Sequence, residues 1–546
     1  MARPAAPEVR TTAGMVGGAW KDKGSIAVFQ GIPYAAPPVA ENRWRAPQPL
    51  TPWSGVRKCT KDGPRAIQRA AMFDVFMETL VDGQGWATPR SMAIKALVAN
   101  APQPKESEDC LHLTVRSPQL GSGAAMPVMV WIHGGDHQDG SSTDPYYTAN
   151  VLASLGVVTV AINYRLGLMG YFAHPELSTE STNGVAGNYG TLDQIAALEW
   201  IRDNISEFGG DPNNVTIFGE SAGGESVMHL MTSPLAQGLF HRAIAQSPAN
   251  AKQMGHLREP FLAYDSAEDT SLAFAKALGI TGPGQLERLR QRSATELYDL
   301  VRAAPLLGDH YPTIDGHVLP ESPLVAFAGG RQSAVPLLIG SNADEGTLLH
   351  PVLEAPMVEY RYQPLPKDAP QAEMTNAFGN DFAALVEHYP GLDRRVAKAE
   401  IDFLGDHMFG ARAFWYARHH ATTGQPTWLY HFTRTPESPS QTAGANHAAE
   451  LSFVHGSNVP IFPMTAADKV LGAQMRQYWT AFASSGSPND FASIGWPQFD
   501  SADPQWLRLD HQIVAEKVER AEVYEIFNAR TARLVEAMSS VGTAIT

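Results

Sequence analysis

The strongest constraint on the fold lies around Ser221. Residues 215–218 (VTIF) have the apolar, β-branched composition of a buried strand, and residues 225–231 have the spacing of a helix. Between them stands Gly219–Gly223 (GESAG), which matches the pattern G-x-S-x-G. A strand that turns sharply into a helix at a serine crowds its backbone, so it needs small residues on both sides. The pattern therefore predicts a nucleophile elbow, with the Ser221 hydroxyl above a sheet and the Ala222 N–H aimed at a developing oxyanion.

The rest of the chain supplies the sheet and helices that such an elbow needs. Strand and helix patterns alternate along it, the strands at residues 128–132, 157–162 and 335–339 and the helices at 195–208, 266–307 and 521–538. This alternation predicts an α/β fold with a central, mostly parallel sheet flanked by helices. The 546 residues would allow three or four domains at about 150 residues each. We find no repeat and no low-complexity linker, and expect one domain over residues 1–546.

Charge and composition exclude several classes of protein. Lys and Arg total 41 against 56 Asp and Glu, a net charge of -15, so nucleic acid and anionic membranes are not expected partners. No stretch approaches the roughly 18 apolar residues of a transmembrane helix. The first 14 residues lack the apolar core of a secretory signal, so we expect a cytoplasmic protein if this start is native. If a leader has been removed, the protein is periplasmic or secreted.

A serine nucleophile needs a second oxyanion donor and a base. Residues 133–136 (HGGD) follow the strand pattern at 128–132, and their glycines allow close backbone approach to a substrate. A metal site built on His133, Asp136 and His137 is the rival interpretation. The adjacent glycines disfavour the helix that this spacing would use, and no further His or Asp cluster completes it. We therefore expect an oxyanion loop and no metal here.

The acid and base of a triad should follow Ser221 in the chain, in that order. Asp344 and Glu345 both come directly after the strand pattern at 335–339, and position alone does not choose between them. Several histidines follow. His447 lies in a loop of small residues that gives access to a pocket, which makes it the preferred base. His419 and His420 instead have the position of an exposed helix face.

Several longer motifs carry a family resemblance. They are residues 29–38 (FQGIPYAAPP), 107–111 (SEDCL), 187–190 (GNYG), 208–212 (FGGDP), 312–316 (PTIDG) and 342–346 (NADEG). With these motifs the sequence resembles the type-B carboxylesterases, the family that includes the cholinesterases, over most of its length. The resemblance implies an α/β-hydrolase fold with large helical and loop insertions over the active site. Here the insertions would lie near residues 66–107 and 256–330.

The resemblance also implies an activity and assigns its residues. It implies a serine carboxylesterase that hydrolyses small-molecule esters through an acyl-enzyme on Ser221, without a cofactor. The family's acid matches Glu345, the glutamate of the D-E-G motif. Its histidine matches His447, which heads residues 447–454 (HAAELSFV). A carbamate or aryl-amide hydrolase with the same triad, or a non-catalytic binding protein of this fold, are the alternatives.

The neighbours of the triad follow from the same comparison. The family's oxyanion donors would lie on the turn Gly134–Asp136, chiefly at Gly135 and Asp136, and at Ala222. Asp136 replaces a glycine, and we hypothesise that a local hydrogen bond holds its carboxylate off the pocket. Glu220 is either a charge close to His447 or a buried carboxylate satisfied by local backbone.

The two cysteines leave an open question. Cys110 matches the second cysteine of a family disulfide, but the place of its usual partner is Ala66. Cys59 lies several residues earlier than that place. A Cys59–Cys110 disulfide and two buried thiols both remain open.

Overall fold

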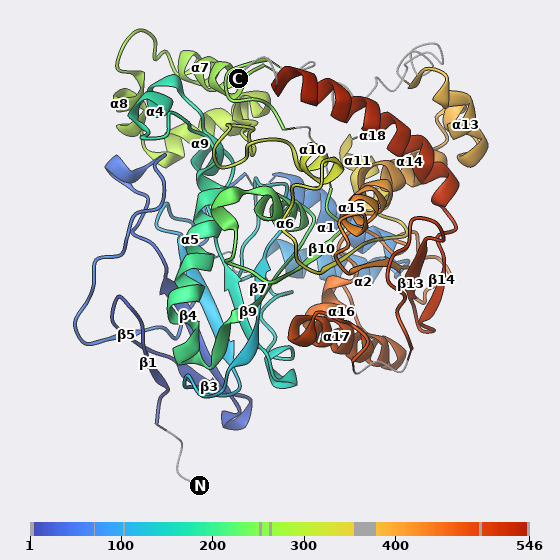
Figure 1. The fold of residues 1–546 in the computed structure, drawn as a ribbon, viewed down its shortest axis with the longest axis horizontal. Coiled ribbons are helices and arrows are strands. Elements are labelled where there is room, and N and C mark those ends of the chain that lie inside the picture. The colour runs from blue at the N-terminus through green and yellow to red at the C-terminus, as the bar shows by residue number, and fades with distance from the viewer. Residues whose placement is uncertain are drawn as a thin grey trace.

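The computed structural model describes residues 5–69, 71–101, 104–249, 254–260, 265–353, 378–490 and 494–542. A large twisted sheet runs through the centre of the molecule, and helices cover it (Figure 1). Within the described residues, eleven strands form this sheet in the order β14-β13-β12-β11-β10-β9-β7-β8-β6-β4-β3. The strands from β8 to β13 pair in parallel, and the strands at the two edges pair antiparallel. This is the mostly parallel sheet expected from the sequence.

The bounds of the strands follow. In chain order, the main sheet contains β3 (Ala19–Lys21), β4 (Ile26–Pro33), β6 (His112–Ser117), β7 (Met126–Ile132), β8 (Val158–Ile162), β9 (Gly210–Glu220), β10 (Arg242–Gln246), β11 (Leu337–Asn342), β12 (Thr427–Phe432), β13 (Gln505–Leu509) and β14 (Val514–Lys517). A small separate sheet contains β1 (Glu8–Arg10), β2 (Met15–Gly17) and β5 (Val56–Lys58).

The helices lie between these strands and in the insertions. Those up to β11 are α1 (Ala71–Gly83), α2 (Thr88–Ala99), α3 (Gly167–Tyr171), α4 (Pro175–Glu180), α5 (Tyr189–Asn204), α6 (Ala222–Thr232), α7 (Ala267–Ala277), α8 (Gln285–Arg290), α9 (Ala294–Ala303) and α10 (Pro323–Ala328). Those after β11 are α11 (Gly346–Leu353), α13 (Asp381–His388), α14 (Ala397–Gly405), α15 (Ala411–Ala421), α16 (Leu451–His455), α17 (Ala466–Ser485) and α18 (Ala521–Gly542).

The central strand β7 shows how the sheet buries both faces. Because successive side chains of a strand point to opposite faces, Val130 and Met129 lie in different layers of the core. Val130 packs in the cluster that contains apolar residues of α5, α6 and α15, whereas Met129 packs in the cluster that contains α16 and α17. A strand buried on both faces has a continuous apolar run, which is why residues 128–132 were recognisable in the sequence.

The expected elements are present, with shifts at their ends. The helix expected at 195–208 begins earlier, at Tyr189, and closes in a 3₁₀ turn, Ile205–Phe208. The strand expected at 335–339 begins at Leu337, directly after Pro336, which has no N–H to donate to a ladder. The exposed position expected for His420 was wrong. Its side chain is buried, because the outer end of α15 packs against the segment that contains Gln332.

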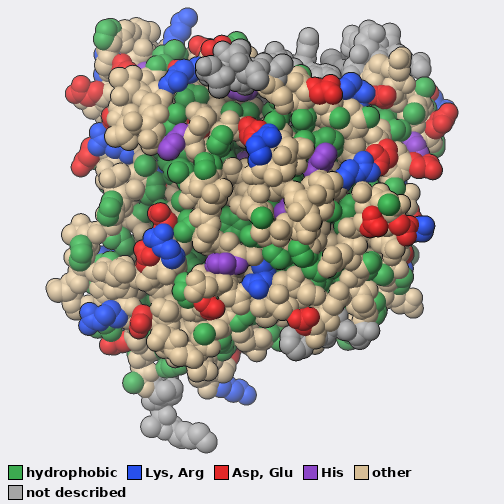
Figure 2. Space-filling view, in the orientation of Figure 1, with side chains coloured by type: hydrophobic (Ala, Val, Ile, Leu, Met, Phe, Trp, Pro, Cys, Tyr) green, Lys and Arg blue, Asp and Glu red, His purple; other side chains and the backbone are tan. Residues whose placement is uncertain are grey.

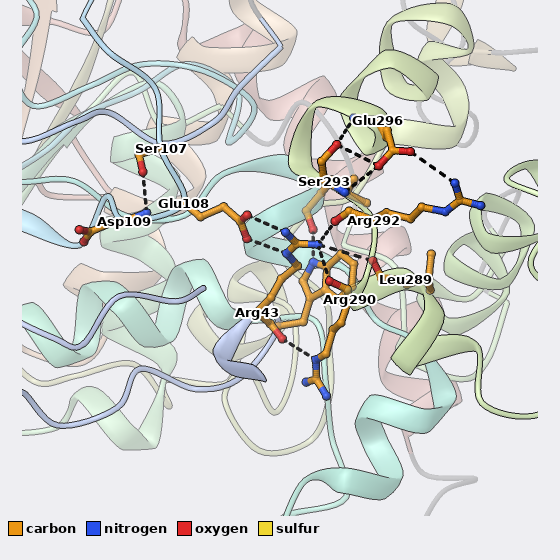
Figure 3. Close-up of polar contacts among 11 residues, drawn as sticks. Arg43, Ser107, Glu108, Asp109, Leu289, Arg290, Arg292, Ser293 and Glu296 are labelled. Carbon is orange, nitrogen blue, oxygen red and sulfur yellow. Dashed lines mark hydrogen bonds and ion pairs between the residues drawn. The ribbon is translucent and has the colours of Figure 1, made fainter. Parts of the chain in front are cut away.

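The insertion at 256–330 is fastened to the N-terminal part of the chain (Figure 3). The guanidinium of Arg43 makes two 2.6 Å hydrogen bonds to the carboxylate of Glu108, within the SEDCL motif. The same guanidinium donates to the carbonyl of Arg292 at 2.7 Å, just beyond α8. A cation at a helix C-terminus is stabilised by the unpaired carbonyls there. Glu108 and Arg43 therefore join two distant parts of the fold.

The surface agrees with the charge balance. On the face drawn in Figure 2, basic and acidic side chains alternate and no extended basic patch appears. No helix in the ranges described above is both long and apolar enough to cross a bilayer.

Candidate active site

Ser221 lies alone between a strand and a helix. β9 ends at Glu220 and α6 begins at Ala222, and Ser221 takes φ 57° and ψ -126°. A non-glycine residue with positive φ is strained, and such strain is common at active sites. The backbone N–H of Ser221 donates to the carbonyl of Gln246 at 2.9 Å, which helps to hold the turn. A Cβ at Gly223 would lie 2.2 Å from a carbonyl oxygen of β7, so only glycine fits there.

The sheet order brings distant residues to one edge. Ser221 follows β9, Glu345 follows β11, and His447 lies in the loop after β12. These strands are parallel neighbours through β10, so their carboxyl ends meet at the same edge of the sheet. Ser221 and His447 both line one cavity there. The ends of parallel strands are where open α/β sheets hold their ligands.

Glu345 holds His447 in a fixed orientation. Glu345 Oε2 lies 2.5 Å from His447 Nδ1, and the Glu345 side chain is fully buried. Its second oxygen accepts from the hydroxyl of Ser247 at 2.5 Å and from the backbone N–H of Asn342 at 2.8 Å. Every side of this carboxylate is thus occupied by a donor. Ser247, at the end of β10, was not found from the sequence, because no pattern links it to Glu345.

Asp344, the other acid that is a candidate by its position, makes different contacts. Its Oδ2 accepts from the backbone N–H of Ala445 at 2.8 Å, and residues 344 and 446 form a short parallel bridge. Asp344 therefore fastens the loop that carries His447 and does not contact the imidazole ring. The two neighbouring carboxylates thus divide into one that holds the loop and one that contacts the ring.

Glu220 lies on the other side of the His447 ring. Its Oε1 is 3.2 Å from His447 Nε2, and this oxygen has no hydrogen-bond partner within the described part of the chain. The structure therefore favours the first interpretation of Glu220, a charge close to His447. No hydrogen bond joins Ser221 Oγ to His447 among the described residues, although both side chains reach the same cavity.

Burial and neighbouring charges act in opposite directions on the pKa values of His447 and Glu220. Burial lowers the pKa of His447, but the carboxylates of Glu220 and Glu345 outweigh burial and raise it to about 9. Burial raises the pKa of Glu220 to about 8; His447 opposes this rise, and Glu450 and Glu345 add to it. The Glu450 carboxylate itself accepts a hydrogen bond from Gln246 Nε2 at 2.9 Å, which helps to fix its position. The imidazolium form of His447 is therefore strongly favoured in this site.

The loop after β7 presents free amides to Ser221. The backbone N–H groups of Gly134, Gly135 and Asp136 donate to no acceptor within the described ranges. A Cβ added at Gly134 would lie 3.1 Å from Ser221 Cβ, so this loop packs directly against the serine. The N–H of Ala222 opens α6, and the first amides of a helix have no acceptor within it. These amides thus belong to a loop that packs against Ser221 and to the first turn of the helix that follows it.

Asp136 has the local hydrogen bond expected for it. The hydroxyl of Tyr311 donates to Asp136 Oδ2 at 2.7 Å. Tyr311 comes from the insertion at 256–330, and nothing in the sequence linked it to residue 136. Asp136 itself has φ 53°, in the region that favours glycine, which matches its place in a glycine motif.

The cavity is about 460 Å³ in volume, within the usual range for small-molecule sites. Its apolar wall comes from several elements and consists of Phe76, Met77, Leu80, Tyr146, Tyr147, Leu348, Leu349, Met408, Phe409, Leu451 and Phe462. Its ionisable side chains, apart from His447, are Arg69, Asp136, Asp139, Asp144, Glu220, Glu225 and Asp309. Both insertions expected over the site contribute: residues 66–107 through α1, and residues 256–330 through Asp309 and Tyr311.

Cys59 and Cys110 are free thiols, and both are buried. The disulfide interpretation is therefore wrong for this structure, and the alternative of two buried thiols holds. Burial raises the pKa of Cys59 to about 11, so its thiol is unreactive at neutral pH. No group of three or more potential metal ligands occurs in the described segments, and His133 instead packs its ring on Tyr164 with centroids 4.5 Å apart.

Comparison with known proteins gives a consistent result. The model of the carboxylesterase family matches residues 5–527. The fumonisin B1 esterase of Sphingopyxis macrogoltabida is 36% identical over 88% of this chain and 82% of its own length. The para-nitrobenzyl esterase of Bacillus subtilis (strain 168) is 35% identical over 90% of this chain and 93% of its own. Among solved structures, a PNB esterase superposes with a TM-score of 0.77 at 30% identity, covering 96% of this chain and 99% of that one.

Proposed function

Because the chain belongs to the carboxylesterase family and is a carboxylic ester hydrolase, we propose that Ser221, Glu345 and His447 are its catalytic triad. The observation that carries this proposal is the 2.5 Å contact between Glu345 Oε2 and His447 Nδ1. It fixes the ring of a histidine that lines the same cavity as the strained Ser221. A carboxylate that orients a histidine beside an exposed serine is the arrangement that activates a serine nucleophile.

The first half of the reaction acylates Ser221. His447 takes the hydroxyl proton at Nε2 while Ser221 Oγ forms a bond to the ester carbonyl carbon. The carbonyl oxygen becomes negative and receives hydrogen bonds from the N–H groups of the Gly134–Asp136 turn and of Ala222. The tetrahedral intermediate then breaks its bond to the alcohol oxygen, and His447 returns the proton to that oxygen. The alcohol leaves, and Ser221 carries the acyl group as an ester.

The second half releases the acid. Water enters in place of the alcohol, His447 takes its proton, and the resulting hydroxide attacks the acyl carbon. The second tetrahedral intermediate breaks its bond to Ser221 Oγ, which regains the proton from His447. In both halves Glu345 and Glu220 stabilise the imidazolium. Loss of one oxyanion donor should raise the barrier by roughly 3–4 kcal/mol.

We further propose that the whole chain forms one catalytic domain and acts on neutral esters with apolar groups. The triad takes its members from three different strands of one sheet, so no part of the chain carries the site alone. The wall formed by α1, α11 and the segment around Phe409 is apolar, which suits an aliphatic or aromatic acyl group. Burial raises the pKa of Asp139 and of Glu220 to about 8, and a cavity that disfavours its own carboxylates also disfavours an anionic acyl group.

Hydrolysis of 4-nitrophenyl esters of graded chain length tests these proposals. We expect turnover by the wild-type protein that rises from acetate to medium-length acyl groups, and none above background for Ser221→Ala. Ser233→Ala is a matched control, since Ser233 is also buried but lies at the far end of α6. Equal rates for Ser221→Ala and the wild type would exclude Ser221 as the nucleophile. A rate that falls steadily beyond acetate would exclude the apolar acyl wall.

A further inference from the structure

The loop that bears Asp136 is held from one side by the insertion at 256–330. Tyr311 donates its hydroxyl to Asp136 Oδ2 at 2.7 Å, and the carbonyl of the preceding residue, His310, accepts from Gln138 Nε2 at 2.8 Å. The neighbouring Asp309 pairs with Arg69 at 3.2 Å. Two consecutive residues of the insertion, His310 and Tyr311, thus bond to Gln138 and Asp136 of the loop.

A different element holds the same loop from behind. His137 Nε2 lies 3.1 Å from Glu225 Oε2, on the helix that begins beside Ser221. Both Asp136 and His137 have φ 53°, a conformation that non-glycine residues adopt only when their surroundings impose it. The hydrogen bonds to Asp136, His137 and Gln138 supply that constraint. The loop conformation therefore depends on side chains well outside the loop.

The direction of the Asp136 carboxylate matters for the reaction. In the proposed mechanism the N–H of Asp136 donates to the ester oxyanion, so the carboxylate of the same residue is only a few bonds away. A carboxylate turned toward that point would oppose the negative charge of the transition state. It would oppose an anionic acyl group as well, in a cavity that Asp139 and Asp144 also line. Some group must therefore keep this carboxylate turned aside.

We propose that Tyr311 is a positioning residue that holds the Asp136 carboxylate away from the oxyanion site, and that this contact sets how strongly the enzyme discriminates against anionic acyl groups. The proposal rests on the catalytic role given to Ser221 and adds a cavity-lining residue that acts through Asp136. In Tyr311→Phe the ring remains and only the hydroxyl is lost. The freed carboxylate can then turn toward the amides of the loop.

The test measures two substrates in a double-mutant cycle. The substrates are 4-nitrophenyl butyrate, which is neutral, and the 4-nitrophenyl ester of succinic acid, whose acyl group carries a carboxylate. We expect Tyr311→Phe to lower kcat for butyrate by about 10-fold with little change in KM, and to lower it further for the succinate ester. In an Asp136→Gly background no carboxylate remains, so the same change at Tyr311 should alter kcat by less than about twofold.

Several results would overturn the proposal. They are an equal loss for Tyr311→Phe in both backgrounds, a Tyr311→Phe enzyme with wild-type kcat and wild-type selectivity, and a large gain in kcat for Asp136→Gly alone. The last would mean that the carboxylate already obstructs the site despite Tyr311. Tyr478→Phe is the matched control, because its hydroxyl donates a hydrogen bond too, to a backbone carbonyl at 2.8 Å, but far from the cavity. It should keep both rates.

A second variant, Asp136→Asn, tests the proposal even if Tyr311→Phe does not fold. Thermal melts first establish whether Tyr311→Phe is folded. Asp136→Asn keeps an acceptor for the Tyr311 hydroxyl and removes the charge, so it should improve the succinate rate relative to the butyrate rate by about threefold or more. An unchanged ratio would refute the role of the Asp136 charge. If the wild-type protein hydrolyses neither ester better than Ser221→Ala, the proposed nucleophile fails and the cycle has no bearing on Tyr311.

Discussion

Replacing Glu220 with Gln should lower the pH at which the enzyme becomes active. Only neutral His447 can take the Ser221 proton, so kcat/KM should rise with pH through the pKa of His447, which lies at about 9. Glu220 Oε1 lies 3.2 Å from His447 Nε2, and both groups are buried. The Glu220→Gln change removes one of the carboxylates that favour the imidazolium. The inflection should therefore move toward acid.

The distance sets the size of the effect. Two unit charges 3.2 Å apart at an effective dielectric constant of about 20 attract by about 5 kcal/mol. Each charge is shared between two atoms, which lengthens the mean separation and reduces this figure. A nearby opposite charge commonly moves a pKa by about 1–3 units, or about 1.4–4 kcal/mol. We expect the inflection to fall by that amount, and the rate on the alkaline plateau to fall as well, because the imidazolium of the transition state loses a stabilising charge.

The assay is kcat/KM for 4-nitrophenyl butyrate from pH 5 to pH 10, with the rate of Ser221→Ala subtracted at each pH. Glu225→Gln is the matched control, because Glu225 lines the same cavity but pairs with His137 at 3.1 Å. Its inflection should move by less than about half a pH unit. An inflection that stays in place or rises in Glu220→Gln would refute the electrostatic role of Glu220. Equal shifts in both variants would show that the charge of the cavity as a whole controls His447.

Three further results are expected. Gly135→Ala should lower kcat by about 100-fold or more while the protein stays folded. The new Cβ would lie 2.2 Å from the Asp139 carbonyl oxygen and displace the oxyanion loop, so an unchanged kcat would contradict this prediction. Asp193→Ala should lower the free energy of unfolding in urea by about 3–5 kcal/mol. It removes the carboxylate that accepts from the buried guanidinium of Arg165 at 2.7 Å, so a loss below about 1 kcal/mol would contradict this prediction. A reductant should leave the unfolding midpoint unchanged, and a thiol reagent should modify the two cysteines only in denaturant, because both are free and buried.

Local patterns predicted Ser221 and its surroundings well. A strand, a tight turn and a helix within residues 215–231 leave a recognisable sequence, and the structure has all three. The acid and base are different, because parallel sheet order decides which later loops reach the serine. Position alone left Asp344 and Glu345 open, and the structure separates them by their contacts.

Residues whose role depends on a single long-range contact could not be found from the sequence. Ser247 reaches Glu345 across 98 residues, and Tyr311 reaches Asp136 across 175. Neither lies in a motif, and serines and tyrosines occur in loops throughout the chain without any catalytic neighbour. The wrong expectation for His420 also arose from a long-range contact. Its helical position is a local property, but its burial comes from Gln332 on a distant segment.

The order of the strands also governs when the site can form during synthesis. Ser221 and the loop after β7 belong to the first half of the chain, whereas Glu345 and His447 emerge later, His447 by more than 200 residues. At about 5–20 residues per second, this interval lasts from roughly ten to forty seconds on the ribosome. For about the first half of it, until Asn342 has been made, the sheet beyond β10 lacks β11 and β12. Because non-local pairing of this kind is slow, a growing chain exposes apolar strands long before it acquires activity, and this interval is when it most needs protection from aggregation.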